Sequence, residues 1–325
     1  MLEDILKYVE PEAARVKDMV SASLRSDISL LNRTNESILD GGGKHIRPLM
    51  ALLVAKACSG GFVTEDTIRF AAATELLHNA TLLHDDVADD SPRRRGKPTV
   101  MSILGCRASV LLGDFWLVKA VDRILQARNN TDVAIRTFAK TLSDLAEGEM
   151  LQLQKASDCD TTEGDYFRII YSKTTSLFEA AAMTAALSVG ASPSLKKAVR
   201  SYAQNLGTAF QIRDDILDYE GGAATGKPAG QDLLEQKITL PLLGALAACP
   251  QKELIIREKV KGIGETPSNK DEVLSFVKQY DGVGYASRRL DEYVDMAVIS
   301  LKELPSGPAR EHLAALARFT AGRKS

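Results

Sequence analysis

Hydrophobic residues recur with a helical period along almost the whole chain. Apolar positions return every three or four residues, whereas alternating β-branched runs and Asn-Gly hairpin signals are missing. We therefore expect an all-α fold. The pattern predicts helices over about residues 2–9, 12–24, 28–39, 65–90, 102–127, 132–155, 160–190 and 194–219, another opened by Pro48, and further amphipathic helices from 238 to 325.

Two acidic clusters interrupt this apolar pattern. The first, Asp85, Asp86 and Asp89, ends a predicted helix and is followed by Arg94 and Arg95. Asp85 and Asp89 lie about 40° apart around the helix axis, so their oxygens can share a hard cation. The arginines then offer forked donors to phosphate. For a single motif of this kind, a solvated acidic helix end followed by a basic turn is an equally good interpretation.

A second cluster with the same spacing changes that balance. Asp214, Asp215 and Asp218 also lie in an apolar helical run, and a glycine-rich segment with Lys227 and Lys237 follows them. Two such motifs, each followed by basic residues, predict a site where magnesium and a diphosphate bind together. A single cavity between antiparallel helices explains the pair better than two domains do.

Two further segments carry charge where a ligand is expected. The triple glycine at 41–43 is followed by Lys44 and Arg47, which suits an anion site, although a plain helix cap is the alternative. His78 lies two turns before Asp85 on nearly the same helix face, and a core histidine is the alternative there.

Lys173 stands beside Thr174 in an alanine-rich apolar helix. Burial of a lysine there requires an anionic partner, unless its side chain extends to the solvent. We expect the acidic residues Asp114, Glu147 and Glu149 to be structural.

Composition limits the class of protein. The chain has 325 residues, 45% of them apolar and 26% charged, with a net charge of −2, which argues against nucleic acid as a partner. The four cysteines are scattered and indicate neither disulfides nor zinc. No apolar run approaches the roughly 20 residues that span a bilayer, and the first residues lack a basic start. With no internal repeat or linker, we expect one domain over residues 1–325 and a cytoplasmic protein.

Together these motifs resemble the trans-isoprenyl diphosphate synthases, in particular the polyprenyl-elongating branch. The resemblance extends from about Gly41 to Pro241 through GGGKHIRP, LLHDDVADDSPRRRGKP, KTTSLF, FQIRDDILDYEG and GKPAGQDLLEQKITLP. Two residues depart from the family pattern. Gln236 stands where glycine is common, and Arg213 stands where an uncharged residue is common.

The resemblance implies roles for individual residues. Asp85 and Asp89 would hold two magnesium ions and Asp214 a third, with Asp86, Asp215 and Asp218 supporting them. The residues implied on the side of the allylic diphosphate are Arg94, Lys173, Gln211, Lys227 and Lys237. Those implied for isopentenyl diphosphate are Lys44, Arg47, His78 and Arg95, and Thr174 would orient the reacting region.

The implied reaction lengthens an allylic diphosphate by one five-carbon unit taken from isopentenyl diphosphate. Ala80 and Thr81, one turn before Asp85, are small where short-chain relatives carry aromatic side chains, so a deep apolar tunnel and an octaprenyl or similar product are expected. Phe115 or Trp116 would contribute to the tunnel floor. The resemblance also implies a homodimer, and we expect the product to pass to a membrane.

Several alternatives remain at this point. One is a farnesyl or geranylgeranyl diphosphate synthase with a shorter product. A class I terpene cyclase is less favoured, because its second metal motif usually mixes Asn, Ser or Thr with Glu. A non-catalytic subunit would be expected to lose acidic motifs, and head-to-head coupling would leave the isopentenyl-side residues without a purpose.

Overall fold

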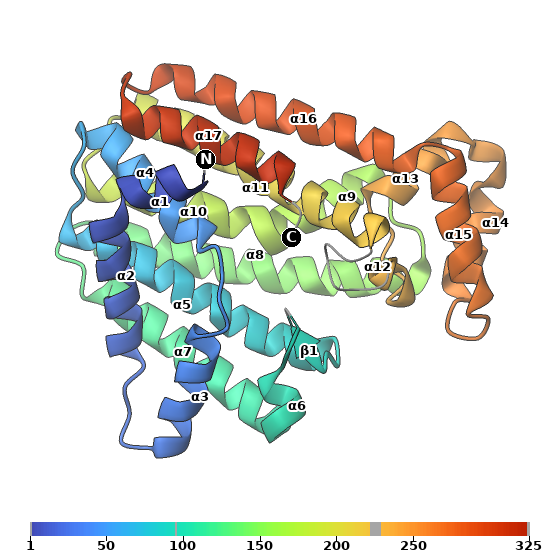
Figure 1. Cartoon of the computed structure of the whole chain (residues 1–325), viewed down its shortest axis with the longest axis horizontal. Coiled ribbons are helices and arrows are strands. Elements are labelled where there is room, and N and C mark those ends of the chain that lie inside the picture. Colours follow the sequence, from blue (N-terminus) through green and yellow to red (C-terminus); the bar gives the residue numbers. More distant parts are fainter. Residues whose placement is uncertain (1, 95, 222–228, 324–325) are drawn as a thin grey trace. The chain divides into compact units, whose positions relative to one another are not determined.

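The chain is helical for most of its length, as the periodicity predicts. The computed structural model describes residues 2–94, 96–221 and 229–323 (Figure 1). The helices up to residue 158 are α1 (Leu2–Tyr8), α2 (Glu10–Ser23), α3 (Ser29–Leu39), α4 (Ile46–Ser59), α5 (Glu65–Ala88), α6 (Val100–Leu104), α7 (Cys106–Leu125) and α8 (Thr131–Asp158). Those that follow are α9 (Glu163–Ile170), α10 (Ser176–Ser188), α11 (Pro193–Glu220), α12 (Gln231–Leu234), α13 (Leu240–Ala248), α14 (Glu253–Lys261), α15 (Ser268–Gln279), α16 (Gly282–Ser300) and α17 (Pro308–Gly322). The expectation of an all-α fold is confirmed.

The residues group into two compact units. The first contains the chain up to Ala139, Ala180–Arg200 and Lys302–Ala315. The second contains Lys140–Glu179, Ser201–Leu301 and the chain from Leu316 onward. Four helices, α8, α10, α11 and α17, contribute residues to both units. That the whole chain is one domain stays a prediction.

Helix α5 is the centre of the first unit. It packs against α2, α4 and α7, and Figure 1 shows α5 and α7 running side by side. Its start is a capping box, in which the Thr64 hydroxyl accepts the Thr67 amide while the Thr67 hydroxyl accepts the Thr64 amide, each at 3.1 Å. Its buried face is continuous from Ile68 to Leu83, so the end of α5 that carries the first acidic motif is held in a packed core.

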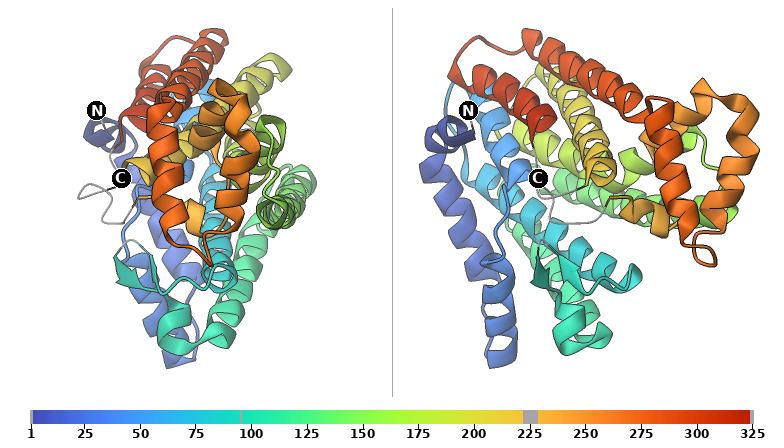
Figure 2. Two further views of the ribbon diagram at one scale, coloured as in Figure 1. Left: turned by 90° about the vertical axis from the view of Figure 1, so that its right-hand side faces the viewer. Right: turned by 45° about the vertical axis from the view of Figure 1, so that its right-hand side comes forward.

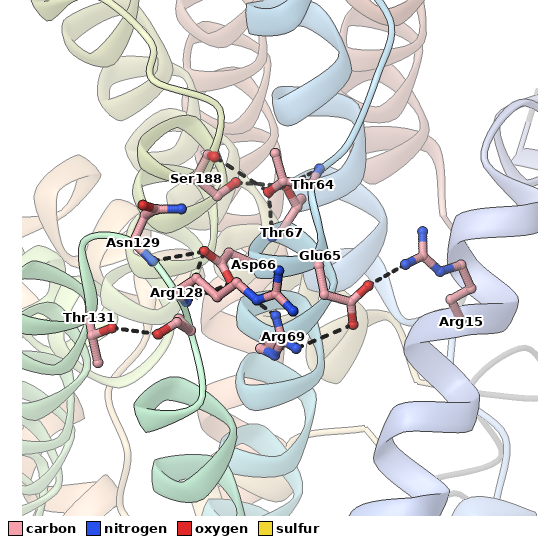
Figure 3. Close-up of polar contacts among 11 residues, drawn as sticks. Arg15, Thr64, Glu65, Asp66, Thr67, Arg69, Arg128, Asn129, Thr131 and Ser188 are labelled. Carbon is pink, nitrogen blue, oxygen red and sulfur yellow. Dashed lines mark hydrogen bonds and ion pairs between the residues drawn. The ribbon is translucent and has the colours of Figure 1, made fainter.

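A buried carboxylate ties the start of α5 to the loop before α8. Asp66 is 5% exposed and accepts the backbone amides of Arg128 and Asn129 at 3.0 to 3.1 Å (Figure 3). Arg69 Nη1 donates to the same carboxylate at 3.0 Å. Because these donors satisfy the buried charge, Asp66 has a structural role at the end of α5 opposite to the acidic motif.

The second unit is built around α13. This short helix is buried on nearly all sides and contacts α15 and α16. The consecutive helices α14 and α15 contact each other as an antiparallel pair, drawn in orange in Figure 2. A single π-helical turn, Tyr171–Thr175, separates α9 from α10 in this unit.

Three local features differ from the expected helices. The helix expected over 102–127 is broken at Gly105, whose φ of +84° is not helical. The helix expected over 160–190 is interrupted by the π turn. Residues after the first acidic motif form a short antiparallel ribbon of β1 (Arg93–Arg94) and β2 (Lys97–Pro98), which no periodicity predicted. A ribbon of two residues per strand is too short to give an alternating pattern.

Within the described residues, no helix combines the length and the apolar character that crossing a membrane requires.

Candidate active site

The first acidic motif forms the last turn of α5, in the first unit. Asp85 and Asp89 are half-buried, whereas Asp86 is only 5% exposed. Arg94, from β1, donates through Nε to Asp86 Oδ1 at 2.7 Å, and the Ser91 amide donates to the Asp86 carbonyl at 2.9 Å. Arg94 therefore neutralises the buried aspartate of the motif, and the β-ribbon keeps it there.

Helix α7 packs against the same turn of α5. Ser109, which is fully buried, donates its hydroxyl to the Leu83 carbonyl at 2.8 Å. A Cβ on Gly113 would come within 2.3 Å of His84 Nε2, so this close contact requires glycine. Asp114 Oδ1 lies 3.3 Å from His84 Nε2, and that Asp114 is structural stays a prediction.

The loop before α4 belongs to the same unit. Lys44 and Arg47 are half-buried on either side of His45, whose backbone is left-handed with φ of +44°. His45 Nδ1 lies 2.9 Å from Oε1 of Glu75. His78 follows Glu75 by one turn of α5, so it lies on the same helix face as this carboxylate.

The second acidic motif lies in α11, in the second unit. Asp214 has a side chain that is 41% exposed, and Arg323 Nη2 lies 2.6 Å from its Oδ1. Asp215 is 3% exposed and accepts the Tyr166 hydroxyl at 2.6 Å and Gln211 Nε2 at 2.8 Å. Asp218 accepts the backbone amides of Gln231 and Asp232 at 3.0 and 3.3 Å, so it caps α12.

Arg323 is held from several sides. Its guanidinium lies 3.8 Å from the centre of the Phe210 ring, and its Nη2 donates to the Phe210 carbonyl at 2.8 Å. Arg213, the departure from the family pattern, donates through Nε to the Arg323 carbonyl at 2.9 Å and pairs with Glu220 at 3.3 Å. Arg213 thus secures the backbone of the arginine that neutralises Asp214.

The π turn positions Lys173 and Thr174. Lys173 Nζ pairs with Glu149 Oε1 at 2.5 Å, so the anionic partner that its burial requires is supplied by α8. Thr174 Oγ1 donates to Gln211 Oε1 at 2.6 Å. A Cβ on Gly148 would meet the Ser172 side chain at 2.6 Å, and one on Gly207 would meet the Thr175 backbone at 2.9 Å. Two helices therefore approach this turn through glycine.

A cavity of about 100 Å³ opens beside this turn. Its wall includes four residues that the sequence predicted for the site, Lys173, Gln211, Asp215 and Lys237. It also includes Tyr166 and Asp232, which sequence reasoning missed. Asp232 had a signal, since it lies in the segment GKPAGQDLLEQK that carries the resemblance, whereas Tyr166 had none.

The carboxylates of this cavity resist ionisation. Burial and the negative charge of Asp232 raise the pKa of Asp215 well above its usual range, despite the hydrogen bond from Tyr166. Burial and the negative charge of Asp218 raise the pKa of Asp232 to about 7, although the positive charge of Lys237 lowers it. The cavity therefore favours a bound cation or added positive charge.

The remaining predicted residues are placed as follows. Ala80 is buried and Thr81 is half-buried, with its hydroxyl donating to the His78 carbonyl at 2.8 Å. Trp116 is fully buried, and its Nε1 donates to Asn35 Oδ1 at 2.8 Å. Arg95 and Lys227 lie outside the described residues. The two acidic motifs belong to different units.

The donor set suits magnesium. Among residues 2–94, 96–221 and 229–323, no three His, Cys, Asp or Glu side chains gather as a ligand set of their own. Asp85, Asp89 and Asp214 instead present partly exposed carboxylates. Magnesium is commonly bound through one or two carboxylates together with phosphate oxygens and water, so these residues fit the ion.

The model of the polyprenyl synthetase family matches residues 28–279, which is most of the chain. The chain belongs to the polyprenyl synthetase family. It is 39% identical to the octaprenyl diphosphate synthase of Haemophilus influenzae over 324 residues, covering 99% of this chain and 97% of that protein. It is 37% identical to the all-trans-nonaprenyl-diphosphate synthase (geranyl-diphosphate specific) of Rhodobacter capsulatus, covering 99% and 98%.

A solved structure of the family has the same fold. The crystal structure of a polyprenyl synthase from Caulobacter crescentus, complexed with calcium and isoprenyl diphosphate, has a TM-score of 0.92 and 34% identity, covering 100% of this chain and 98% of that one. The chain is thus a trans-prenyltransferase of the polyprenyl synthetase family, as the motifs predicted. The alternative functions raised from the sequence, a class I terpene cyclase and a non-catalytic subunit, are not favoured.

Proposed function

We propose that this prenyltransferase condenses isopentenyl diphosphate with an allylic diphosphate, head to tail, and makes octaprenyl diphosphate or a product of similar length. One observation carries the proposal. In both acidic motifs the second aspartate, Asp86 or Asp215, is buried and bonded by protein donors, while the first, Asp85 or Asp214, is partly exposed. The full-length similarity to octaprenyl diphosphate synthases supports the product length.

Three magnesium ions complete the proposed site. Asp85 and Asp89 are proposed to hold two of them and Asp214 the third, with Asp86, Asp215 and Asp218 as supporting residues. The contacts of the supporting residues agree with this division, because each accepts bonds from protein groups that fix it in place. Magnesium supplies charge stabilisation for the departing diphosphate.

Two sets of side chains are proposed to hold one substrate each. Lys44, Arg47, His78 and Arg95 are proposed to bind isopentenyl diphosphate. Arg94, Lys173, Gln211, Lys227 and Lys237 are proposed to bind the allylic diphosphate, and Thr174 to orient the reacting region through its bond to Gln211. Lys173 is paired with Glu149, so a diphosphate at Lys173 has to share or replace that carboxylate.

The chemistry follows from charge and water exclusion. Cationic side chains stabilise the diphosphate as the allylic C–O bond ionises, and apolar helix walls keep water away from the carbocation. The double bond of isopentenyl diphosphate then attacks the cation, and loss of a proton gives the longer allylic diphosphate. We assign that proton to the released diphosphate, because no side chain of the predicted set is an obvious base.

Product length is proposed to depend on the α5 positions just before the first motif. Ala80 is 1% exposed, so its side chain faces the protein interior. A small residue there leaves the wall open to a growing chain. Phe115 and Trp116 of α7 are proposed to contribute to the floor, and the bond from Trp116 to Asn35 keeps that indole in place.

The assembly proposed is a homodimer that uses α7. Leu111, Val118 and Leu125 are 57 to 60% exposed and recur every seven residues, so they form one apolar row along the helix. An apolar row of this kind marks an interaction surface. A second copy of the chain is the proposed occupant, because the family resemblance implies pairing through long apolar helices.

Incubation with and without isopentenyl diphosphate tests the reaction. Protein expressed alone, with farnesyl diphosphate, isopentenyl diphosphate and magnesium, should give longer allylic diphosphates, measured by chromatography of the dephosphorylated products. Asp85→Asn and Asp214→Asn should each lower kcat/KM at least about 100-fold, because the loss of about 2.7 kcal/mol of transition-state stabilisation has this effect. Asp295→Asn, on the exposed face of α16, is the matched control. Consumption of the allylic diphosphate alone, to a hydrocarbon or alcohol, would establish the cyclase instead.

Ala80→Phe should shorten the product by several five-carbon units, because the ring fills the proposed tunnel one turn before Asp85. The product distribution is measured by chromatography with authentic standards, and a thermal melt shows whether the larger side chain disturbs the core. Ala146→Phe, on the exposed side of α8, should leave the distribution unchanged. A folded Ala80→Phe enzyme that still makes the wild-type product would refute the tunnel position.

Arg323→Gln should lower the magnesium concentration needed for half-saturation. Arg323 competes with a cation for Asp214, and a competing contact of about 1 kcal/mol changes the apparent affinity about fivefold. The readouts are activity and the rise in melting temperature with added magnesium and diphosphate. Arg310→Gln is the control, because that α17 arginine donates to the Leu304 carbonyl. A higher magnesium requirement would mean that Arg323 assists the ion.

Val118→Glu should convert a dimer into monomers. Two buried glutamates at the centre of the apolar row would face each other without partners, which disfavours association. Light scattering should then report half the wild-type molar mass at micromolar concentration. Leu254→Glu on α14 is the control, since Leu254 is 71% exposed outside the proposed surface. A wild-type protein that is monomeric would contradict the assembly.

A further inference from the structure

Glu75 is a buried acidic residue of α5 that the proposed reaction does not use. It is 8% exposed, and its Oε1 lies 2.9 Å from Nδ1 of His45 and 3.1 Å from Nδ2 of Asn79, which donates to it. Burial alone would raise the pKa of Glu75, but the hydrogen bond and charge of His45, with His78 and Asn79, lower it to about 2. Glu75 is therefore a carboxylate at neutral pH.

The group that contacts this carboxylate lies in a costly backbone conformation. His45 has φ of +44° and ψ of +42°, directly before the first residue of α4. A left-handed residue other than glycine costs about 1 kcal/mol or more, and surrounding contacts have to compensate for it. The His45 side chain is 54% exposed, so the bond to Glu75 is a contact that supplies this compensation.

His45 is placed between two cations of the proposed isopentenyl diphosphate side. Lys44 precedes it, and Arg47 lies in the first turn of α4 after it. When the backbone at His45 is held in place, the directions in which the side chains of Lys44 and Arg47 point are fixed as well. A bond from α5 to His45 therefore sets the geometry of the loop.

The same carboxylate also lies beside His78, the third described residue predicted for isopentenyl diphosphate. Glu75 and His78 are three residues apart on α5, so their side chains are neighbours on one helix face. Glu75 is consequently close to His78 while its oxygen holds His45. The Asn79 amide, which bonds both the Glu75 side chain and its carbonyl, keeps the carboxylate oriented.

We propose that Glu75 is a positioning residue for isopentenyl diphosphate: through His45 it fixes the loop that carries Lys44 and Arg47, and it holds negative charge beside His78. This inference rests on the proposed function, in which those three residues bind isopentenyl diphosphate. In this proposal Glu75 acts through His45 and not by contact with the substrate. The competing explanation is a buried ion pair that contributes only to stability.

Glu75→Gln tests the proposal, because it keeps the size and one oxygen acceptor of the side chain while it removes the charge. The KM for isopentenyl diphosphate should rise about tenfold, which corresponds to about 1.4 kcal/mol, whereas the KM for the allylic substrate should change less than about twofold. The rise in melting temperature produced by isopentenyl diphosphate alone should shrink in parallel.

Asp66→Asn is the matched control. Asp66 is another buried and hydrogen-bonded carboxylate of α5, and it lies near the start of the helix, at the end opposite to the acidic motif (Figure 3). Its loss should lower the melting temperature and leave both KM values unchanged. If Glu75→Gln behaves in the same way, its role is structural and the proposal is refuted.

His45→Gly provides a second route in case Glu75→Gln does not fold. Glycine accepts the left-handed backbone, so folding is preserved while the contact to Glu75 is lost. The same selective rise in the KM for isopentenyl diphosphate is expected, and an unchanged KM would refute the proposal. If the wild-type protein neither binds nor condenses isopentenyl diphosphate, the proposed function itself fails, which separates the two failures.

Discussion

Repulsion between neighbouring carboxylates is the constraint that shapes this protein. Each acidic motif places two aspartates side by side and a third one turn later, in helices whose other faces are packed. Such charges remain close together only when groups of opposite charge or hydrogen-bond donors offset them. The chain supplies these partners itself, with Arg94 on Asp86, and with Tyr166 and Gln211 on Asp215.

The surrounding structure serves to keep those partners in place. A two-residue ribbon holds Arg94, and α7 contacts the same turn of α5 through Ser109 and the glycine opposite His84. In the second unit, α8 and α11 approach the π turn through Gly148 and Gly207. Irregular backbone of this kind is frequent at functional sites. Local strain and close packing thus lie next to the residues that carry the proposed chemistry.

Features that depend on residue spacing within one helix could be predicted from the sequence. Features that depend on contacts between distant parts of the chain could not. The all-α class and the placing of Asp85 and Asp214 at helix faces follow from spacing alone. Tyr166 was missed because its bond to Asp215 joins positions 49 residues apart. Spacing along the chain did not indicate that Glu149 pairs with Lys173, because the two residues come from separate helical segments. The breaks at Gly105 and at the π turn depend on backbone angles that composition does not encode.

The arrangement around Arg323 has a practical consequence for preparing the protein. The guanidinium of this residue stacks on Phe210 and neutralises Asp214, and Arg213 holds its carbonyl. A bulky or acidic group placed close to this arginine, such as a purification tag, would compete for the same contacts. Keeping such a group away from Arg323 leaves the aspartate with its native neighbour.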